Sequence, residues 1–249
     1  MSDDFFIGWA PTPEPDRRFL LRAALGLVAI GAGAGGLLAS QQAPPGPGQW
    51  KQGEVRTWRG LLVREPYPAL RTLDLDGSPR TAFLATSGKL GVQGRLTNEM
   101  CGAVAVRGSL IARGRHAMIA VPDGDDWITL ASASEPDLAE MREEDLGEVL
   151  LVGEILDSKC WFGAMRPGQG KPHKSCASLC LRGGLPAAFC AGPNCGEGSE
   201  APLFLDAQGR AHGHELLSLA ADPVRALGRL VRVGDVTQFR ADLSNVARL

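Results

Sequence analysis

The chain has 249 residues, of which 26 are basic and 28 acidic, so its formal net charge is −2. This balance lacks the basic footprint with which proteins bind phosphate backbones, so we expect no nucleic-acid partner. A hydrophobic content of 44% excludes a disordered chain, and 32 glycines with 17 prolines indicate many turns and short strands.

The first apolar segment follows a cluster of arginines. Arg17, Arg18 and Arg22 precede an uncharged run from Ala23 to Ser40. Because positive charges stay on the inner side, we expect residues 1–16 to be a cytoplasmic tail and the bulk of the chain to be periplasmic. Residues 17–40 are then a single-pass anchor in a bacterial inner membrane, or alternatively a twin-arginine export signal.

The apolar run is rich in glycine. Gly31 and Gly35 have the spacing with which small residues let two membrane helices pack closely. We therefore expect this helix to lie in the membrane and to pack there against the other subunits of a hetero-oligomeric membrane-protein complex.

After the anchor, two linkers divide the chain. Residues 41–52 are rich in proline and glycine, which predicts an extended stalk. Residues 134–146 contain six acids and one arginine and predict a second linker. The linkers leave two segments, residues 53–133 and 147–249, as separate domains.

These two segments repeat each other. The matching stretches are Gly60–Val63 with Gly153–Leu156, Phe83–Lys89 with Phe204–Arg210, and Val104–Gly114 with Val224–Gly234. Each copy has short apolar strands separated by glycine turns, in the same order. The fold expected is mainly β: two small barrels related by internal duplication and resembling the OB-fold.

The second copy carries an insertion, assigned to residues 160–195, with most of the cysteines. Its stretch from Cys160 to Cys180 has the spacing Cys-x12-His-x2-Cys-x3-Cys. This stretch is similar to a motif of membrane-anchored bacterial cell-envelope proteins. The resemblance covers this stretch and, more loosely, the Phe5-Phe6 start ahead of the apolar run, and it implies no particular activity.

Four groups in the insertion are candidate metal ligands: Cys160, His173, Cys176 and Cys180. Three thiolates and an imidazole suffice for a tetrahedral site, and sulfur ligands favour zinc, copper or an iron–sulfur centre. Basic residues surround the cluster and are expected to lower the pKa values of the thiols. They are Lys159, Arg166, Lys171, Lys174 and Arg182.

The alternative is a disulfide framework, since cysteines outside the cytoplasm tend to oxidise. The candidates are Cys160, Cys176, Cys180, Cys190 and Cys195, and their pairing cannot be read from sequence. His212 and His214 follow a turn and are expected to be solvated. Asp157 and Glu154 are interpreted as surface charges.

No catalytic motif is present, so nothing positive indicates an enzyme. The function expected is that of a membrane-tethered, periplasm-facing accessory subunit of a larger complex, in electron transport. One alternative is a protein that handles a metal or thiol redox chemistry. A second alternative is a periplasmic ligand-binding module.

Overall fold

The computed structural model describes residues 12–40, 48–74, 76–131, 138, 141–192, 195 and 200–249. Residues 1–11 of the expected tail and 41–47 of the first linker lie outside the described residues. The chain divides into two compact units, Met1–Pro44 and Pro45–Leu249.

The described part of the first unit contains one long helix, α1 (Glu14–Ser40). Its stretch Glu14–Gly36 has a mean hydropathy of 1.6 and is long and apolar enough to cross a membrane. Glu14 and Asp16 occupy the first turn, where negative charge favours the helix N-terminus. Gly31 and Gly35 both lie within this helix, and their packing role stays a prediction.

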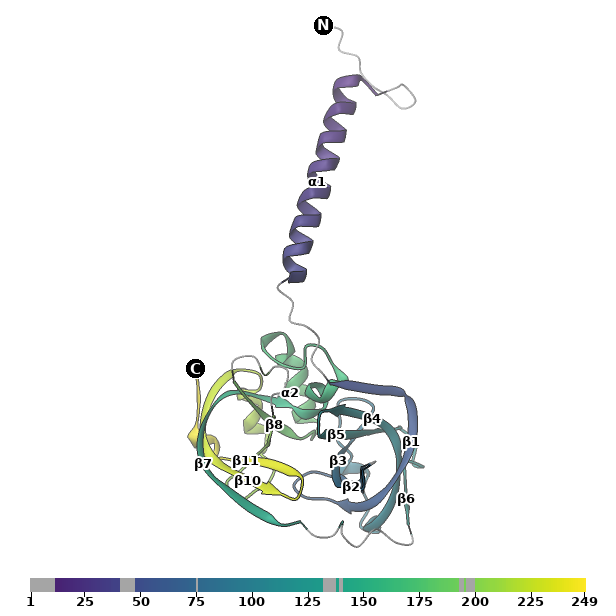
Figure 1. The fold of residues 1–249 in the computed structure, drawn as a ribbon, viewed down its shortest axis with the longest axis vertical. Coiled ribbons are helices and arrows are strands. Elements are labelled where there is room, and N and C mark those ends of the chain that lie inside the picture. The colour runs from purple at the N-terminus through teal and green to yellow at the C-terminus, as the bar shows by residue number, and fades with distance from the viewer. Residues whose placement is uncertain are drawn as a thin grey trace. The chain divides into compact units, whose positions relative to one another are not determined.

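The second unit begins with a five-stranded barrel (Figure 1). β1 pairs with β2, β2 with β3, β3 with β5, β5 with β4, and β4 returns to β1. Of these five described pairs, only β3–β5 is parallel. The elements are β1 (Gln49–Val63), β2 (Ala69–Leu73), β3 (Pro79–Thr86), η1 (Gln93–Arg95), β4 (Gly102–Arg113), β5 (His116–Val121) and β6 (Ile128–Leu130), which adds to β4.

The second barrel repeats this order. β7 pairs with β8, β8 with β9, β9 with β11 in parallel, β11 with β10, and β10 with β7. Its elements are β7 (Glu143–Asp157), β8 (Ala187–Ala191), β9 (Leu203–Leu205), η5 (His214–Leu219), β10 (Pro223–Val233), β11 (Val236–Arg240), η6 (Leu243–Asn245) and β12 (Val246–Arg248). The expected mainly β fold with two OB-like barrels is confirmed.

Strand register supports two of the three matched stretches residue by residue. Gly60 lies opposite Val104, and Gly153 lies opposite Val224, as the matched stretches predict. A Cβ at Gly60 would be 2.0 Å from the carbonyl oxygen of Arg71, and one at Gly153 would be 2.0 Å from that of Cys190. Both glycines therefore let the first strand of a barrel cross closely over the second.

The sequence match between Phe83–Lys89 and Phe204–Arg210 is shifted by one residue relative to the structural equivalence of the two strands. Phe83 belongs to an apolar cluster together with Leu203 and Leu205, whereas Phe204 faces the interior of the second barrel. The structural equivalent of Phe83 is thus a neighbour of Phe204, because a shift of one residue along a strand exchanges its two faces.

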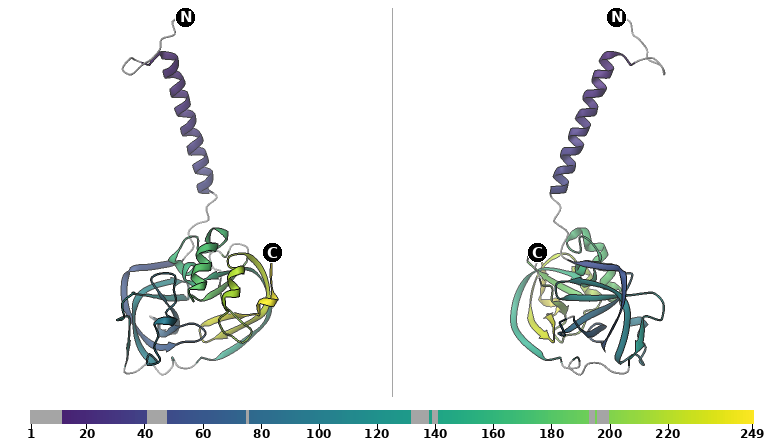
Figure 2. Two further views of the ribbon diagram at one scale, coloured as in Figure 1. Left: turned by 180° about the vertical axis from the view of Figure 1, so that it is seen from behind. Right: turned by 45° about the vertical axis from the view of Figure 1, so that its right-hand side comes forward.

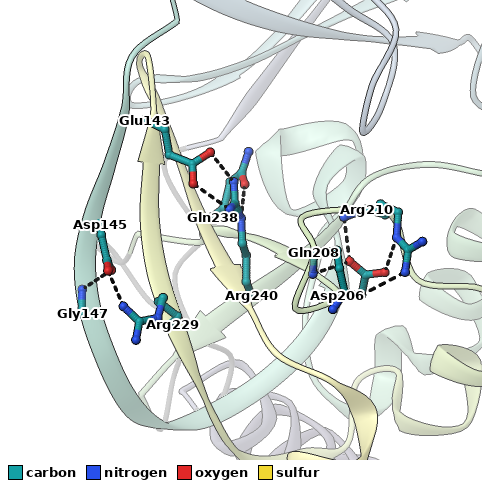
Figure 3. A network of polar contacts seen from close by, with 9 residues as sticks. All are labelled: Glu143, Asp145, Gly147, Asp206, Gln208, Arg210, Arg229, Gln238 and Arg240. Atoms are coloured by element: carbon teal, nitrogen blue, oxygen red, sulfur yellow. Dashed lines mark hydrogen bonds and ion pairs between the residues drawn. The ribbon is translucent and has the colours of Figure 1, made fainter.

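The structure also corrects the linker boundaries. β1 starts at Gln49, so the stalk's last residues are strand, and β7 starts at Glu143 inside the presumed acidic linker. Glu143 pairs with Arg240 at 2.9 and 3.1 Å, and Asp145 pairs with Arg229 (Figure 3). These acids bind arginines on adjacent strands of the second barrel and are part of its sheet.

Among the described residues, three large apolar clusters and one small one, formed by Ala177, Ala220 and Ala221, make up the core. One fills the first barrel and includes Val104 and Val106, and another fills the second and includes Phe189 and Phe239. The third joins residues of both barrels to Trp161 and Phe162. The barrels lie side by side with the helix α2 between them (Figures 1 and 2).

Candidate metal centre

The predicted metal ligands all lie in the connection between β7 and β8, residues 158–186. The equivalent connection between β1 and β2 covers only residues 64–68. The additional chain forms a π-helical turn, η3 (Cys160–Ala164), a 3-10 turn, η4 (Lys171–His173), and the α-helix α2 (Lys174–Arg182). The insertion therefore ends before β8, and Cys190, which we assigned to it, is a residue of the barrel strand.

Glycines let this connection fold back on itself, as its composition predicts. Gly170 has a φ of 72°, in the left-handed region that favours glycine. A Cβ at Gly168 would lie 2.6 Å from the carbonyl oxygen of Cys160. The close approach of these segments returns the chain to Cys160 just before α2 begins.

Three of the four predicted ligands come together. The Sγ atom of Cys160 is 3.7 Å from that of Cys176 and 4.0 Å from that of Cys180, and all three lie within 4.8 Å of one another. With metal–sulfur distances of ~2.3 Å, two ligands of a tetrahedral zinc site are ~3.8 Å apart. The three sulfurs, called here the thiol cluster, thus have the spacing of one face of such a site.

The thiol cluster is largely shielded from solvent. Cys160 is 5% exposed and Cys180 is 1% exposed, while Cys176 is partly exposed. Cys176 and Cys180 are four residues apart in α2, so their side chains lie on the same face of that helix. Access to the cluster is therefore through Cys176.

His173, the fourth predicted ligand, is turned toward a different partner. Its Nε2 lies 2.8 Å from Oδ2 of Asp157, and both side chains are 0% exposed. Oδ1 of Asp157 accepts a hydrogen bond of 2.8 Å from the backbone N–H of Cys160. His173 thus supports Cys160 through Asp157, and these three residues form a second potential ligand group.

Asp157 was interpreted as a surface charge, and the structure corrects this. The signal available in the sequence was an Asp three residues before Cys160, at the end of the apolar stretch Ile155–Leu156. An Asp in that position accepts the N–H of a following helical turn. Glu154 is half-buried and accepts a 2.8 Å hydrogen bond from the N–H of Gly170.

A lysine of the first barrel completes the surroundings. Nζ of Lys89 donates to Sγ of Cys176 at 2.6 Å. Lys159 is buried and donates to the carbonyl oxygens of Thr86, Ser87 and Gly88 at 2.6, 3.0 and 2.6 Å. Of the basic residues expected around the cluster, Lys174 binds Asp222 and Arg166 binds the carbonyl of Gly48.

These contacts shift the pKa values of two thiols in opposite directions. The hydrogen bond to Cys180 raises the pKa of Cys160, and burial raises it further. The same bond lowers the pKa of Cys180. The general lowering expected from the sequence therefore holds for Cys180 and is wrong for Cys160. The contact with Cys176 raises the pKa of Lys89, which keeps its amine protonated.

The remaining cysteines and histidines take other roles. Cys190 and Cys195 form a disulfide, while Cys101, Cys160, Cys176 and Cys180 are free. The ring of His212 stacks on Phe204 at 4.7 Å. Neither His212 nor His214 belongs to a potential metal-ligand group in the described part of the chain.

No family model and no curated protein matches the sequence. Among solved structures, the chain is similar to a deletion mutant of the single-stranded DNA binding protein from Thermus aquaticus. The identity is 13%, the match covers 82% of this chain and 89% of that chain, and the TM-score is 0.21.

The expectation that nucleic acid is excluded as a partner is withdrawn. That expectation came from the overall charge alone, whereas the structural neighbour is a protein that binds single-stranded DNA. At this TM-score the likeness gives no argument about what the present chain binds.

Proposed function

We propose that this protein is a membrane-anchored metal-binding protein that holds one soft metal ion, Cu(I) or Zn²⁺, at Cys160, Cys176 and Cys180. The observation that carries the proposal is the spacing of the three free thiols, 3.7 and 4.0 Å from Cys160. Thiolates select such ions over magnesium or calcium. An iron–sulfur cluster is less suited, because it is usually held by four cysteines.

The arrangement of the sulfurs favours metal over a structural disulfide at this place. Cys190 and Cys195 are already bonded to each other. The thiol cluster instead contains three sulfurs at similar separations. A disulfide joins only two of them and leaves the third unpaired. A metal ion uses all three.

We further propose that the barrels face the periplasm of a bacterium. The arginines at positions 17, 18 and 22 precede the apolar part of α1, which favours a cytoplasmic N-terminus. The Cys190–Cys195 disulfide fits an oxidising compartment. The role as an accessory subunit in electron transport stays a prediction.

Thiol–disulfide exchange is a second candidate function. Cys176 is partly exposed and lies beside Cys160, so the two thiols form a dithiol open to a partner at one end. In this reaction Cys160 and Cys176 would become a disulfide, releasing two electrons and two protons that reduce the disulfide of a partner to two thiols.

Metal content and thiol content together test the proposal. We would purify the full chain anaerobically in detergent, load it with Zn²⁺ or Cu(I), and measure bound metal and reactive thiols. We expect one ion per chain in the parent and in Cys101→Ser, which removes an exposed free thiol outside the cluster. Cys160→Ser, Cys176→Ser and Cys180→Ser should each lose the ion.

Absence of bound metal in the parent would contradict the proposal. If, in addition, mild oxidation removed two reactive thiols from the parent and none from Cys160→Ser, the exchange function would replace it.

A further inference from the structure

The first barrel contributes a charged residue to the thiol cluster. Lys89 lies in the turn after β3, far in sequence from the cysteines, and its Nζ is 2.6 Å from Sγ of Cys176. The cluster is therefore composite: its sulfurs come from the insertion of the second barrel, and its nearest cation comes from the first.

Several contacts hold this turn against α2. The backbone N–H of Gly91 donates to the carbonyl of Gly183 at 2.8 Å. Nε2 of Gln93 donates to the carbonyl of Gly184 at 2.6 Å. A Cβ at Gly183 would be 2.1 Å from the carbonyl oxygen of Lys89, so the end of α2 packs directly on the Lys89 backbone.

Lys159 fixes the same turn from the buried side. Its ammonium is bound by the carbonyl oxygens of Thr86, Ser87 and Gly88, so it is occupied in supporting the turn. Lys89 has its ammonium on a sulfur, so its charge acts directly on the cluster. The position of Lys89 is thus set by backbone contacts that do not depend on its own side chain.

We propose that Lys89 is a specificity-determining residue that favours Cu(I) over Zn²⁺ at this site. The inference rests on the proposed metal function. Three thiolates carry three negative charges, so bound Cu(I) leaves a net charge of −2 and bound Zn²⁺ leaves −1. A cation in contact with a sulfur stabilises the more negative complex more strongly. Residues that support metal ligands in this way commonly change affinity by about 10–100-fold.

The experiment compares the affinities of the full-length protein for Cu(I) and Zn²⁺, each measured anaerobically by competition with a chelator. The variants are Lys89→Met, which removes the charge, and Lys89→Arg, which keeps it. Lys51→Met is the matched control, because Lys51 is an exposed lysine of β1. Thermal unfolding of each metal-free variant checks that the fold is intact.

We expect Lys89→Met to weaken Cu(I) binding by about tenfold and Zn²⁺ binding by clearly less, at the lower end of what such residues contribute. Lys89→Arg and Lys51→Met should keep the parent's preference. Equal losses for both ions, or no loss for either, would overturn the inference while the metal site itself stands. A parent chain that binds neither ion would overturn the proposed function, and the inference with it.

Discussion

At Asp157, one buried carboxylate joins two segments of the candidate site. One oxygen accepts the N–H of Cys160, and the other contacts His173, which precedes α2. Cys160 and the helix that carries Cys176 and Cys180 are thus held by the same side chain. At the scale of single residues, the geometry of the thiol cluster depends on a group that is not itself a member of it.

Replacing Asp157 by alanine should therefore destabilise the protein. The change leaves the Cys160 N–H and the ring of His173 buried without their partner, and one unsatisfied buried polar group costs about 1–3 kcal/mol. Urea unfolding measures the loss. Asp125→Ala, at an exposed acid, is the control and should change the free energy of unfolding by less than about 0.5 kcal/mol. Equal effects of the two substitutions would contradict the structural role of Asp157.

At the scale of elements, the insertion packs against both barrels. Trp161 is 2% exposed and Phe162 is 1% exposed, both within η3. The guanidinium of Arg113 lies 4.1 Å from the ring centre of Trp161, and the ring of His116 stacks on Phe162 at 5.2 Å. Arg113 and His116 belong to the first barrel, so the insertion of the second barrel is packed against the first.

Trp161→Ala should accordingly destabilise the pair of barrels. A buried tryptophan replaced by alanine typically costs about 3–5 kcal/mol, and here the cavity would open between the barrels. Denaturant unfolding followed by circular dichroism measures the cost, with Trp161→Phe as the milder variant that keeps an aromatic ring. A loss below about 1 kcal/mol in Trp161→Ala would show that the insertion is a dispensable loop.

An ion pair joins α2 to the second barrel and makes the stability of the fold depend on pH. Asp222 accepts hydrogen bonds from Nζ of Lys174 at 2.6 and 2.7 Å, and Arg248 lies 3.0 Å from it. The bond from Lys174 lowers the pKa of Asp222 below its ordinary value of 3.8. Because the folded-state pKa is depressed, the ionised carboxylate stabilises the fold above pH 3.8, and this stabilisation is lost as the pH falls through the folded-state value.

Asp222→Asn should remove this pH-dependent part of the stability. The difference in unfolding free energy between the parent and the variant is expected to be largest near neutral pH and to shrink as the solution is acidified below the ordinary pKa of Asp222. Urea titrations over a series of pH values measure it. A difference that stays constant across the series would show that Asp222 acts through shape and hydrogen bonding alone.

At the scale of the whole molecule, the sequence predicted what local patterns encode. Repeated glycines and apolar strands predicted two barrels of one topology, and arginines before an apolar run predicted a helix able to cross a membrane. The Cys-x12-His-x2-Cys-x3-Cys stretch predicted a set of four ligands, of which the three thiols lie together while His173 contacts Asp157 instead. These features depend on periodicity and on residues close in the chain.

Long-range contacts were not predictable in the same way. The acids at the start of β7 look like a linker until the arginines of β10 and β11 are placed beside them. No motif or spacing in the sequence relates Lys89 to Cys176. Phe83 and Phe204 are identical residues in the two aligned stretches, yet their side chains lie on different faces of their sheets. The face is set by the hydrogen-bonded register of the strand with its neighbours, which the sequence match does not give.

The most direct test is the X-ray absorption spectrum of the zinc-loaded full-length protein, which counts sulfur ligands around the ion. We expect about three sulfurs at ~2.3 Å in the parent and one sulfur fewer in any zinc retained by Cys176→Ser. His173→Ala should leave the sulfur count of the bound ion unchanged. A shell of nitrogen and oxygen with a single sulfur would contradict the proposed site and place the metal at Asp157, Cys160 and His173 instead.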